Sequence, residues 1–251
     1  MSDRRLFLRQ AVMAAVGALL AGCDRISNSD SGTQILESAE ALTRRAQGLL
    51  SPHTALAKEF SVADISPVFK ANGTTMPGTP AYQALMRDDF RDYRLKVDGL
   101  VSHPRTWSVD ELKQLGQRTQ ITRHDCVEGW SAIGQWTGTP LAALLAAVAP
   151  LRNARYVVFH CFDEWEDDTF YYESIDLLEA THPQTILAHS LNGQPLPVAN
   201  GAPLRLRVER QLGYKHAKYI ERIELVASFE DIGDGNGGYW EDNGYEWYAG
   251  I

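Results

Sequence analysis

One cysteine of this chain has neighbours that would let its sulfur atom do chemistry. Cys126 lies in the segment TRHDCVEGWS (residues 122–131), among charged and aromatic side chains, and it follows a predicted β-strand. Apart from Cys23, which directly follows the N-terminal leader, the chain has one other cysteine, Cys161, so we do not expect a disulfide framework. A cysteine with charged neighbours can ionise to a thiolate, which serves as a nucleophile or as a soft ligand for a metal ion.

Four segments, in order along the chain, resemble segments of the sulfite-oxidase family of molybdopterin enzymes. CVEGWS (residues 126–131) resembles the segment in which the family's cysteine sulfur binds molybdenum. The other three are FKANG (69–73), NGAPLRLR (200–207), and LGYK (212–215) with the following AKYI (217–220). The resemblance covers residues 60–251, and it implies an oxidoreductase that carries molybdenum and molybdopterin and catalyses a two-electron oxygen-atom transfer.

The resemblance also implies which residues hold the cofactor. The dithiolene of molybdopterin and the thiolate of Cys126 would bind the molybdenum, so Cys126 is the expected catalytic metal ligand. The remaining matches to cofactor-contacting positions are Asn72, Cys161, Asn200, Arg205, Gly213, Tyr214 and Lys215.

Two of these positions leave alternatives open. Arg205 would anchor the pterin phosphate, because a guanidinium binds oxygen atoms through two donors. Alternatively, it belongs to a solvated strand face and pairs with Glu209. Cys161 replaces a threonine of relatives of the methionine-sulfoxide-reductase type, so it either contacts the pterin or fills the core.

Other kinds of cysteine site are possible from the residues alone. A zinc site could combine His124, Cys126, His160 and Cys161, but adjacent residues of one strand point to opposite faces, and the chain has no Cys-x2-Cys spacing. In a cysteine hydrolase, Cys126 would be the nucleophile and His124 or His160 its base, with a third orienting group that the sequence does not identify. An inert buried cysteine is the remaining alternative.

The predicted reaction is reduction of a small-molecule or protein sulfoxide. A sulfite dehydrogenase with a separate electron acceptor is an alternative, and its dianionic substrate would need cationic side chains, for which Arg123, Arg207 and Arg210 are candidates. The second alternative is a lipoprotein that only binds a ligand. No Cys-x-x-Cys-His haem motif is present, so we expect a separate electron-transfer partner, such as a membrane haem protein. The formal net charge of −8 argues against nucleic acid as a partner.

The N-terminus has the features of an export signal. Arg4 and Arg5 precede Leu-Phe-Leu and a short apolar run, so residues 1–22 resemble a twin-arginine signal. Cys23 follows Leu-Ala-Gly and resembles a lipidated lipoprotein cysteine. We therefore expect a periplasmic protein whose membrane contact is a lipid anchor, with a polar tether over residues 23–59 and a catalytic domain over residues 60–251. A helix could form within the tether, over residues 34–50.

The pattern of the domain predicts an α+β fold, because strands mix with short helices and do not alternate with them regularly. Strands are expected over residues 93–101, 120–125, 155–162, 169–174 and 219–226. Asn192-Gly193 predicts a hairpin between residues 187–191 and 194–198. Helices should begin at the capping box 108–111, at Thr139-Pro140, and over residues 175–180.

Side-chain alternation adds two expectations. His124 should share a strand face with Cys126, whereas residues 204–209 should present one apolar and one charged face. The segment 232–251 is rich in glycine and aromatic residues, and we expect its rings to hold it against the domain surface.

Overall fold

A computed structural model describes residues 55–165 and 169–251 of the chain. Outside the described residues lie the predicted signal segment, Cys23, the helix at residues 34–50 and most of the tether. The predicted division into signal segment, tether and catalytic domain therefore stays a prediction. Among the described residues, no helix combines the length and the apolar character needed to cross a membrane.

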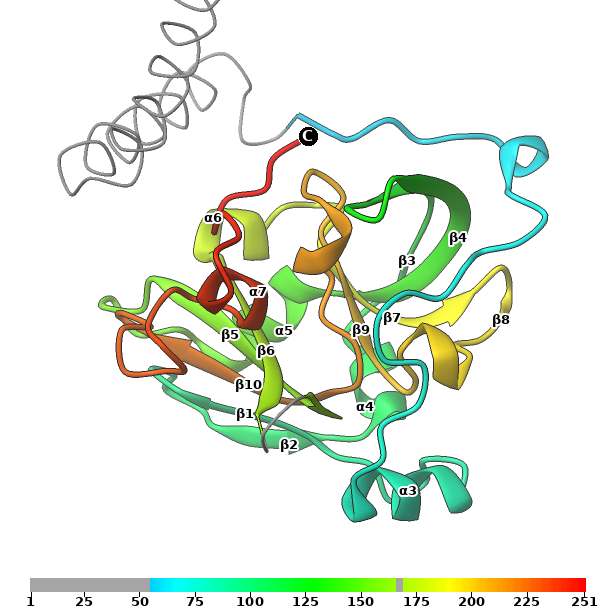
Figure 1. Cartoon of the computed structure of the whole chain (residues 1–251). Coiled ribbons are helices and arrows are strands. Elements are labelled where there is room, and N and C mark those ends of the chain that lie inside the picture. Colours follow the sequence, from blue (N-terminus) through cyan, green and yellow to red (C-terminus); the bar gives the residue numbers. More distant parts are fainter. Residues whose placement is uncertain (1–54, 166–168) are drawn as a thin grey trace, which may run out of the picture. The chain divides into compact units, whose positions relative to one another are not determined.

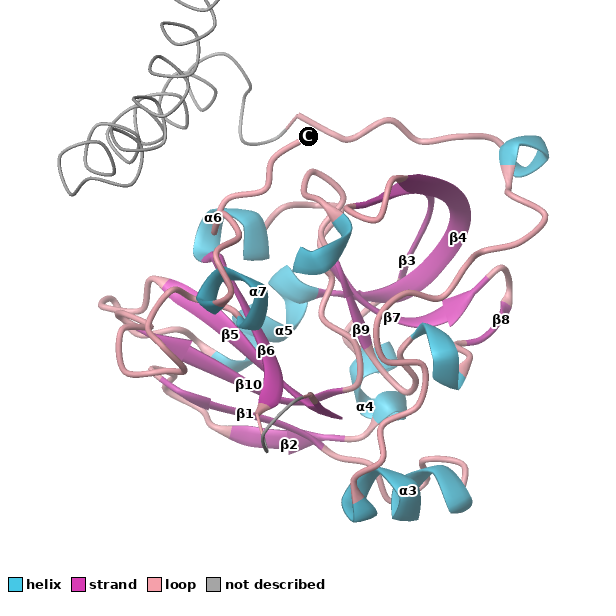
Figure 2. Cartoon of the chain, viewed as in Figure 1, coloured by secondary structure: helices cyan, strands magenta, loops and turns pink. Residues whose placement is uncertain are grey.

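Two sheets form the frame of the described part of the chain (Figures 1 and 2). In the first sheet the strand order is β2-β1-β10-β5-β6, and β1 and β10 run parallel while the other neighbours are antiparallel. Its strands are β1 (Leu95–Gly99), β2 (Arg105–Trp107), β5 (Tyr156–Glu164), β6 (Phe170–Asp176) and β10 (Ile220–Val226).

The second sheet carries Cys126. Its order is β3-β4-β7-β8, with β9 also paired to β7, and all of these pairs are antiparallel. Its strands are β3 (Arg118–Cys126), β4 (Trp130–Pro140), β7 (Ile186–Leu191), β8 (Gln194–Pro195) and β9 (Arg205–Arg207). Strands β3 and β4 form a long hairpin in which Cys126 pairs with Trp130, so the cysteine lies at the hairpin tip.

Short helices lie around the two sheets (Figure 2). They are the α-helices α3 (Pro80–Arg87), α4 (Val109–Gln114), α5 (Leu141–Val148), α6 (Leu177–Ala180) and α7 (Tyr239–Asp242), and the 3-10 helices η1 (Val62–Asp64), η3 (Val198–Asn200) and η4 (Gly213–Lys215). The capping box at the start of α4 is present, because Ser108 accepts from the Glu111 backbone and the Glu111 side chain accepts from the Ser108 backbone.

The main core joins the two sheets. Buried side chains of β1, β5 and β10 pack with the apolar face of α5 and with Leu204 and Leu206, which flank Arg205. A smaller cluster packs around Trp136 of β4, which is fully buried. The strand that carries Arg205 is therefore held between two apolar clusters.

The α+β class is confirmed, as are the predicted strand that ends at Cys126 and the Asn192-Gly193 hairpin. Strands β2 and β4 and helix α3 were not predicted. Helix α5 begins at Leu141, one residue later than expected, with Pro140 as its N-cap. The C-terminal rings do pack on the domain, and they do so partly through the unpredicted helix α7.

The predicted alternation of residues 204–209 is confirmed, because Leu204, Leu206 and Val208 belong to the main core. The charged face is not solvated, however, since Arg205, Arg207 and Glu209 are also buried. The two arginines lie over the ring of Trp136, at 5.3 and 4.5 Å from its centroid. The charged face is thus enclosed by the second sheet, so the solvated alternative for Arg205 is excluded.

Candidate active site

Cys126 lies where strand β3 ends and a tight turn begins. The turn closes with a hydrogen bond from the Gly129 backbone N–H to the Cys126 carbonyl (3.0 Å), and Gly129 adopts a φ of +84°. The cysteine is 8% exposed, and burial raises the pKa of its thiol. A thiol with a raised pKa is not an activated nucleophile, which argues against the hydrolase alternative. A bound metal ion would deprotonate such a thiol outright.

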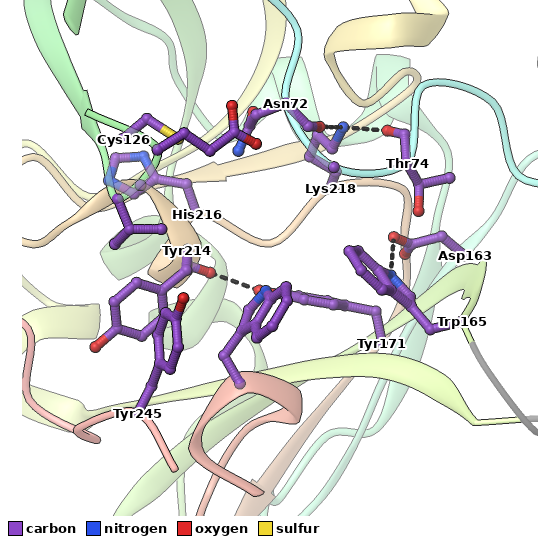
Figure 3. Close-up of a pocket in the computed structure, with 15 residues that line it drawn as sticks. Asn72, Thr74, Cys126, Asp163, Trp165, Tyr171, Tyr214, His216, Lys218 and Tyr245 are labelled. Carbon is purple, nitrogen blue, oxygen red and sulfur yellow. Dashed lines mark hydrogen bonds between the residues drawn. The ribbon is translucent and has the colours of Figure 1, made fainter. Parts of the chain in front are cut away.

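A pocket of about 320 Å³ opens beside Cys126 (Figure 3). One wall is polar and includes Asn72, His216 and Lys218. The facing wall consists largely of aromatic rings, among them Tyr171 and Tyr245. In Figure 3, Cys126 lies near one end of the pocket, and Asp163 lies near the other.

Arg205 is a buried cation that binds no anion in the described part of the chain. Its Nη1 donates to the backbone oxygen of Asn200 (3.2 Å), whereas its Nε and Nη2 have no hydrogen-bond partner among the described residues. The Nδ2 of Asn200 is also buried, and no described residue pairs with it. Burial, followed by the charge of Arg207, lowers the pKa of Arg205 to about 9, so the side chain is still charged at neutral pH. Two free donors on a buried guanidinium indicate a site for an anionic ligand.

Lys218 is a second such cation. Its Nζ donates to backbone oxygens of Asn72 (2.6 Å), Thr74 and Ala199 (3.4 Å), and to no carboxylate among the described residues. Burial, followed by the charge of Arg205, lowers its pKa to about 7. The first carbons of both side chains pack on Gly201, since a Cβ there would lie 3.0 Å from the Cβ and Cγ of Lys218 and 3.3 Å from the Cβ of Arg205.

These observations fit molybdopterin. Its phosphate would neutralise Arg205 and Lys218, and its heterocycle carries donors and acceptors for buried groups such as the unpaired Oδ1 of Asn72. When bound, the cofactor supplies a metal centre that exchanges two electrons. The chain contributes the thiolate of Cys126, the buried cations and the enclosing walls.

His124 shares the face of Cys126, as predicted, since both side chains are buried along β3. Its Nδ1 accepts from Nη1 of Arg207 (3.0 Å), and Arg207 itself is bound by Glu209, so the remaining proton of the ring is on Nε2. Gly213 packs directly on this ring, because a Cβ there would lie 2.6 Å from the His124 Nε2. Glycine is required at position 213 for this close approach.

The structure brings six of the eight predicted residues to the pocket or to its buried cations. Cys126, Asn72, Gly213 and Tyr214 line the pocket, and Arg205 lies beside Lys218. Asn200 does not line it, but its backbone binds Arg205. Cys161 and Lys215 lie elsewhere.

Cys161 is 1% exposed and belongs to the main core, where its thiol faces the Phe159 carbonyl at 3.9 Å. Lys215 is fully buried and forms ion pairs with Glu173 and Glu241. Its ammonium group is therefore committed to two carboxylates.

Sequence reasoning missed several lining residues. Lys218 and His216 belong to the stretch that follows LGYK, and the second lysine was the signal that could have indicated them. Asp163 and the rings of Trp165, Tyr171, Trp240 and Tyr245 were also not predicted. Burial raises the pKa of Asp163 to about 6, although Trp165 donates to its Oδ2 (3.2 Å).

The residues needed for two of the alternatives are not assembled. Among the described residues, no group of three or more His, Cys, Asp or Glu side chains could hold a metal ion, and His160 pairs with Glu224 (2.9 Å), which leaves the zinc alternative unsupported. None of the three arginines considered for sulfite lines the pocket. Arg123 pairs with Asp125, Arg207 with Glu209, and Arg210 with Glu179.

Comparison with known proteins defines the class. The protein-family model described as an oxidoreductase molybdopterin binding domain matches residues 82–231. The chain belongs to this family, the sulfite-oxidase family of molybdopterin oxidoreductases, which confirms the resemblance, the molybdenum and molybdopterin cofactor, and the prediction of an enzyme. The alternative of a lipoprotein that only binds a ligand is set aside.

Three relatives of this chain are named as subunits of protein-methionine-sulfoxide reductases. The chain is 39% identical over 252 aligned positions to a putative protein-methionine-sulfoxide reductase subunit, YedZ1, of Azospira oryzae, covering 98% of this chain and 87% of the relative. It is 36% identical to the protein-methionine-sulfoxide reductase catalytic subunit MsrP of Ralstonia nicotianae, over 61% of this chain and 49% of the relative. For MsrP of Xanthomonas campestris the identity is 40%, over 53% and 45%. The matched region thus spans about half the length of the two MsrP proteins.

A solved structure shares the fold. The sulfane dehydrogenase SoxCD from Paracoccus pantotrophus superposes with a TM-score of 0.50, at 21% identity, over 55% of this chain and 39% of that one. At this identity the likeness supports the fold alone.

Proposed function

We propose that this enzyme reduces a sulfoxide to a thioether. The overall reaction takes R2S=O, two electrons and two protons to R2S and water. The observation that carries the proposal is the composition of the pocket beside Cys126, whose facing wall consists largely of aromatic rings. No arginine lines this pocket, and its one lysine, Lys218, is the cation expected to bind the cofactor phosphate. Sulfite is a dianion and needs cations, whereas a sulfoxide is neutral and has apolar substituents. The names of the relatives support the same reaction.

Turnover assays with the molybdenum-loaded enzyme test this function. With reduced viologen as electron donor, N-acetylmethionine sulfoxide methylamide should be reduced, and no turnover is expected without the donor, because a separate partner supplies the electrons. The kcat/KM for reduction of this sulfoxide should exceed the kcat/KM for sulfite oxidation by at least about tenfold. This factor corresponds to the free energy of one charge-assisted hydrogen bond that the sulfite dianion would lack in this pocket. Faster sulfite oxidation would instead support the sulfite dehydrogenase alternative.

We also propose that the enzyme is exported by the twin-arginine route and anchored through Cys23. The motif around Arg4 and Arg5 supports this, and so does the cofactor, because a cofactor inserted in the cytoplasm requires export of a folded protein. Exchanging both arginines for lysine should leave loaded enzyme in the cytoplasm, and Cys23→Ala should move it from the membrane fraction to the soluble periplasm. Fractionation followed by molybdenum analysis checks both changes, and unaltered export of the double variant would refute the signal assignment.

A further inference from the structure

The chain's C-terminal segment supplies much of one side of the pocket. Five lining residues form what we call the aromatic wall, namely Trp165, Tyr171, Tyr214, Trp240 and Tyr245. Trp240 and Tyr245 stack with centroids 5.1 Å apart and an interplanar angle of 29°. Tyr214 meets Tyr245 edge-on at 5.1 Å, and Trp165 meets Trp240 edge-on at 5.3 Å. The rings thus form a continuous surface.

Much of this surface is apolar even though it contains tyrosines. The hydroxyl of Tyr171 donates to the Tyr214 carbonyl (2.6 Å), and the hydroxyl of Tyr214 donates to the Glu246 carbonyl (2.6 Å). The indole N–H of Trp165 donates to Asp163 (3.2 Å). Because these polar atoms are bound to the protein, the carbon atoms of the rings are left to face the pocket.

The aromatic wall is fixed in position by a buried ion cluster. Lys215 donates to both Glu173 of β6 and Glu241 of α7, and all three side chains are at most 1% exposed. Since Glu241 directly follows Trp240, these bonds hold helix α7 and its tryptophan against the first sheet. Such fixed side chains are what a specific binding surface requires.

Facing the aromatic wall is the polar wall with Asn72, His216 and Lys218, of which Asn72 and Lys218 are expected to hold the cofactor (Figure 3). A sulfoxide has the same two-sided character, with a polar S=O bond and two apolar carbon substituents. Sulfur and its methyl group pack favourably against aromatic rings at about 5 Å.

We propose that the aromatic wall binds the carbon substituents of the substrate's sulfur atom, with Trp240 and Tyr245 as the contacting residues. This inference rests on the proposed function and narrows the substrate to neutral dialkyl sulfoxides of the methionine sulfoxide kind. Tyr245 is 40% exposed, so the wall reaches the pocket mouth, where the rest of a bound chain can leave the site.

The test uses Trp240→Ala and Tyr245→Ala in the molybdenum-loaded enzyme. The KM for N-acetylmethionine sulfoxide methylamide should rise about tenfold in each, with kcat little changed, because the lost contact contributes equally before and during the reaction. Inhibition by the thioether N-acetylmethionine methylamide should weaken by the same factor, and molybdenum content should stay at the wild-type level.

A control separates this role from general packing. Phe229→Ala removes another C-terminal ring, one that packs on Tyr156 and Trp247 outside the pocket lining, and it should keep the wild-type KM.

The possible results separate a failure of the aromatic-wall inference from a failure of the proposed sulfoxide reduction. If the wild type reduces the sulfoxide but KM and thioether inhibition are unchanged in both alanine variants, the inference is overturned and the function stands. Loss of molybdenum in those variants would mean that the wall stacks on the cofactor, which also overturns it. If the wild type binds the thioether through these rings without reducing the sulfoxide, only the proposed function fails. If the wild type neither binds the thioether nor reduces the sulfoxide, both the inference and the proposed function fail.

Discussion

The Cys126→Ser variant is expected to lose at least about 100-fold in turnover, together with its protein bond to molybdenum. Loss of even an outer-shell partner typically costs 10–100-fold in metal affinity or activity, and Cys126 is the proposed ligand itself. A serine hydroxyl is a harder ligand than a thiolate and ionises far less readily, so it cannot replace the sulfur. Elemental analysis gives the molybdenum content, and X-ray absorption should show one sulfur ligand fewer than in the wild type.

Cys161→Ala is the matched control, because both cysteines are buried but Cys161 is enclosed by the main core. It should keep its molybdenum and lose about 1 kcal/mol of unfolding free energy, the cost of a small cavity. If Cys161→Ala lost molybdenum and Cys126→Ser kept it, the assignment of the ligand would be reversed.

The place of Cys126 at a strand end could be predicted because the alternation along residues 120–126 is local. Its partner strand β4 could not, because Gly134 and Gly138 interrupt the pattern of that segment. The structure shows why these glycines are needed. A Cβ on Gly138 would lie 2.3 Å from the Leu187 carbonyl of β7, and one on Gly134 would lie 3.0 Å from Phe69 and Leu191. Close strand packing thus requires the residue type that weakens the sequence signal.

The sequence predicted Lys215 and not Lys218 as a cofactor-binding residue, because the difference between the two lysines depends on contacts that the sequence does not show. Both lysines belong to the same short stretch, but helix η4 directs Lys215 toward Glu173 and Glu241, which are distant in sequence. Only the fold shows that one lysine is neutralised by carboxylates while the other is bound by backbone carbonyls beside Arg205. For the same reason the ring-rich C-terminus could be predicted to pack on the domain, but not to line the pocket.

Arg205→Met is expected to weaken cofactor retention by about one to two orders of magnitude for each lost hydrogen bond to the phosphate. A charge-assisted bond contributes roughly 1.5–3 kcal/mol, and about 1.4 kcal/mol corresponds to a factor of ten. Leu206→Ala, on the opposite face of β9, should instead lower the unfolding free energy by about 2–5 kcal/mol, because Leu206 is fully buried in the main core. The folded fraction of that variant should still hold molybdopterin, which is measured by its fluorescence after release.

Cofactor-free protein gives a sharper test, in which two neighbouring arginines should behave oppositely. Arg205 and Arg207 lie on one face of β9 and both cover Trp136, but Glu209 neutralises only Arg207. Without cofactor, Arg205 is a buried charge with two unpaired donors, so replacing it with methionine of similar length should raise the unfolding free energy. Arg207→Met should lower it by about 3–5 kcal/mol, because Glu209 is then left buried without its partner. Thermal and denaturant unfolding of the two variants checks the signs, and a destabilised Arg205→Met that keeps full cofactor would show that Arg205 supports the fold and not the phosphate.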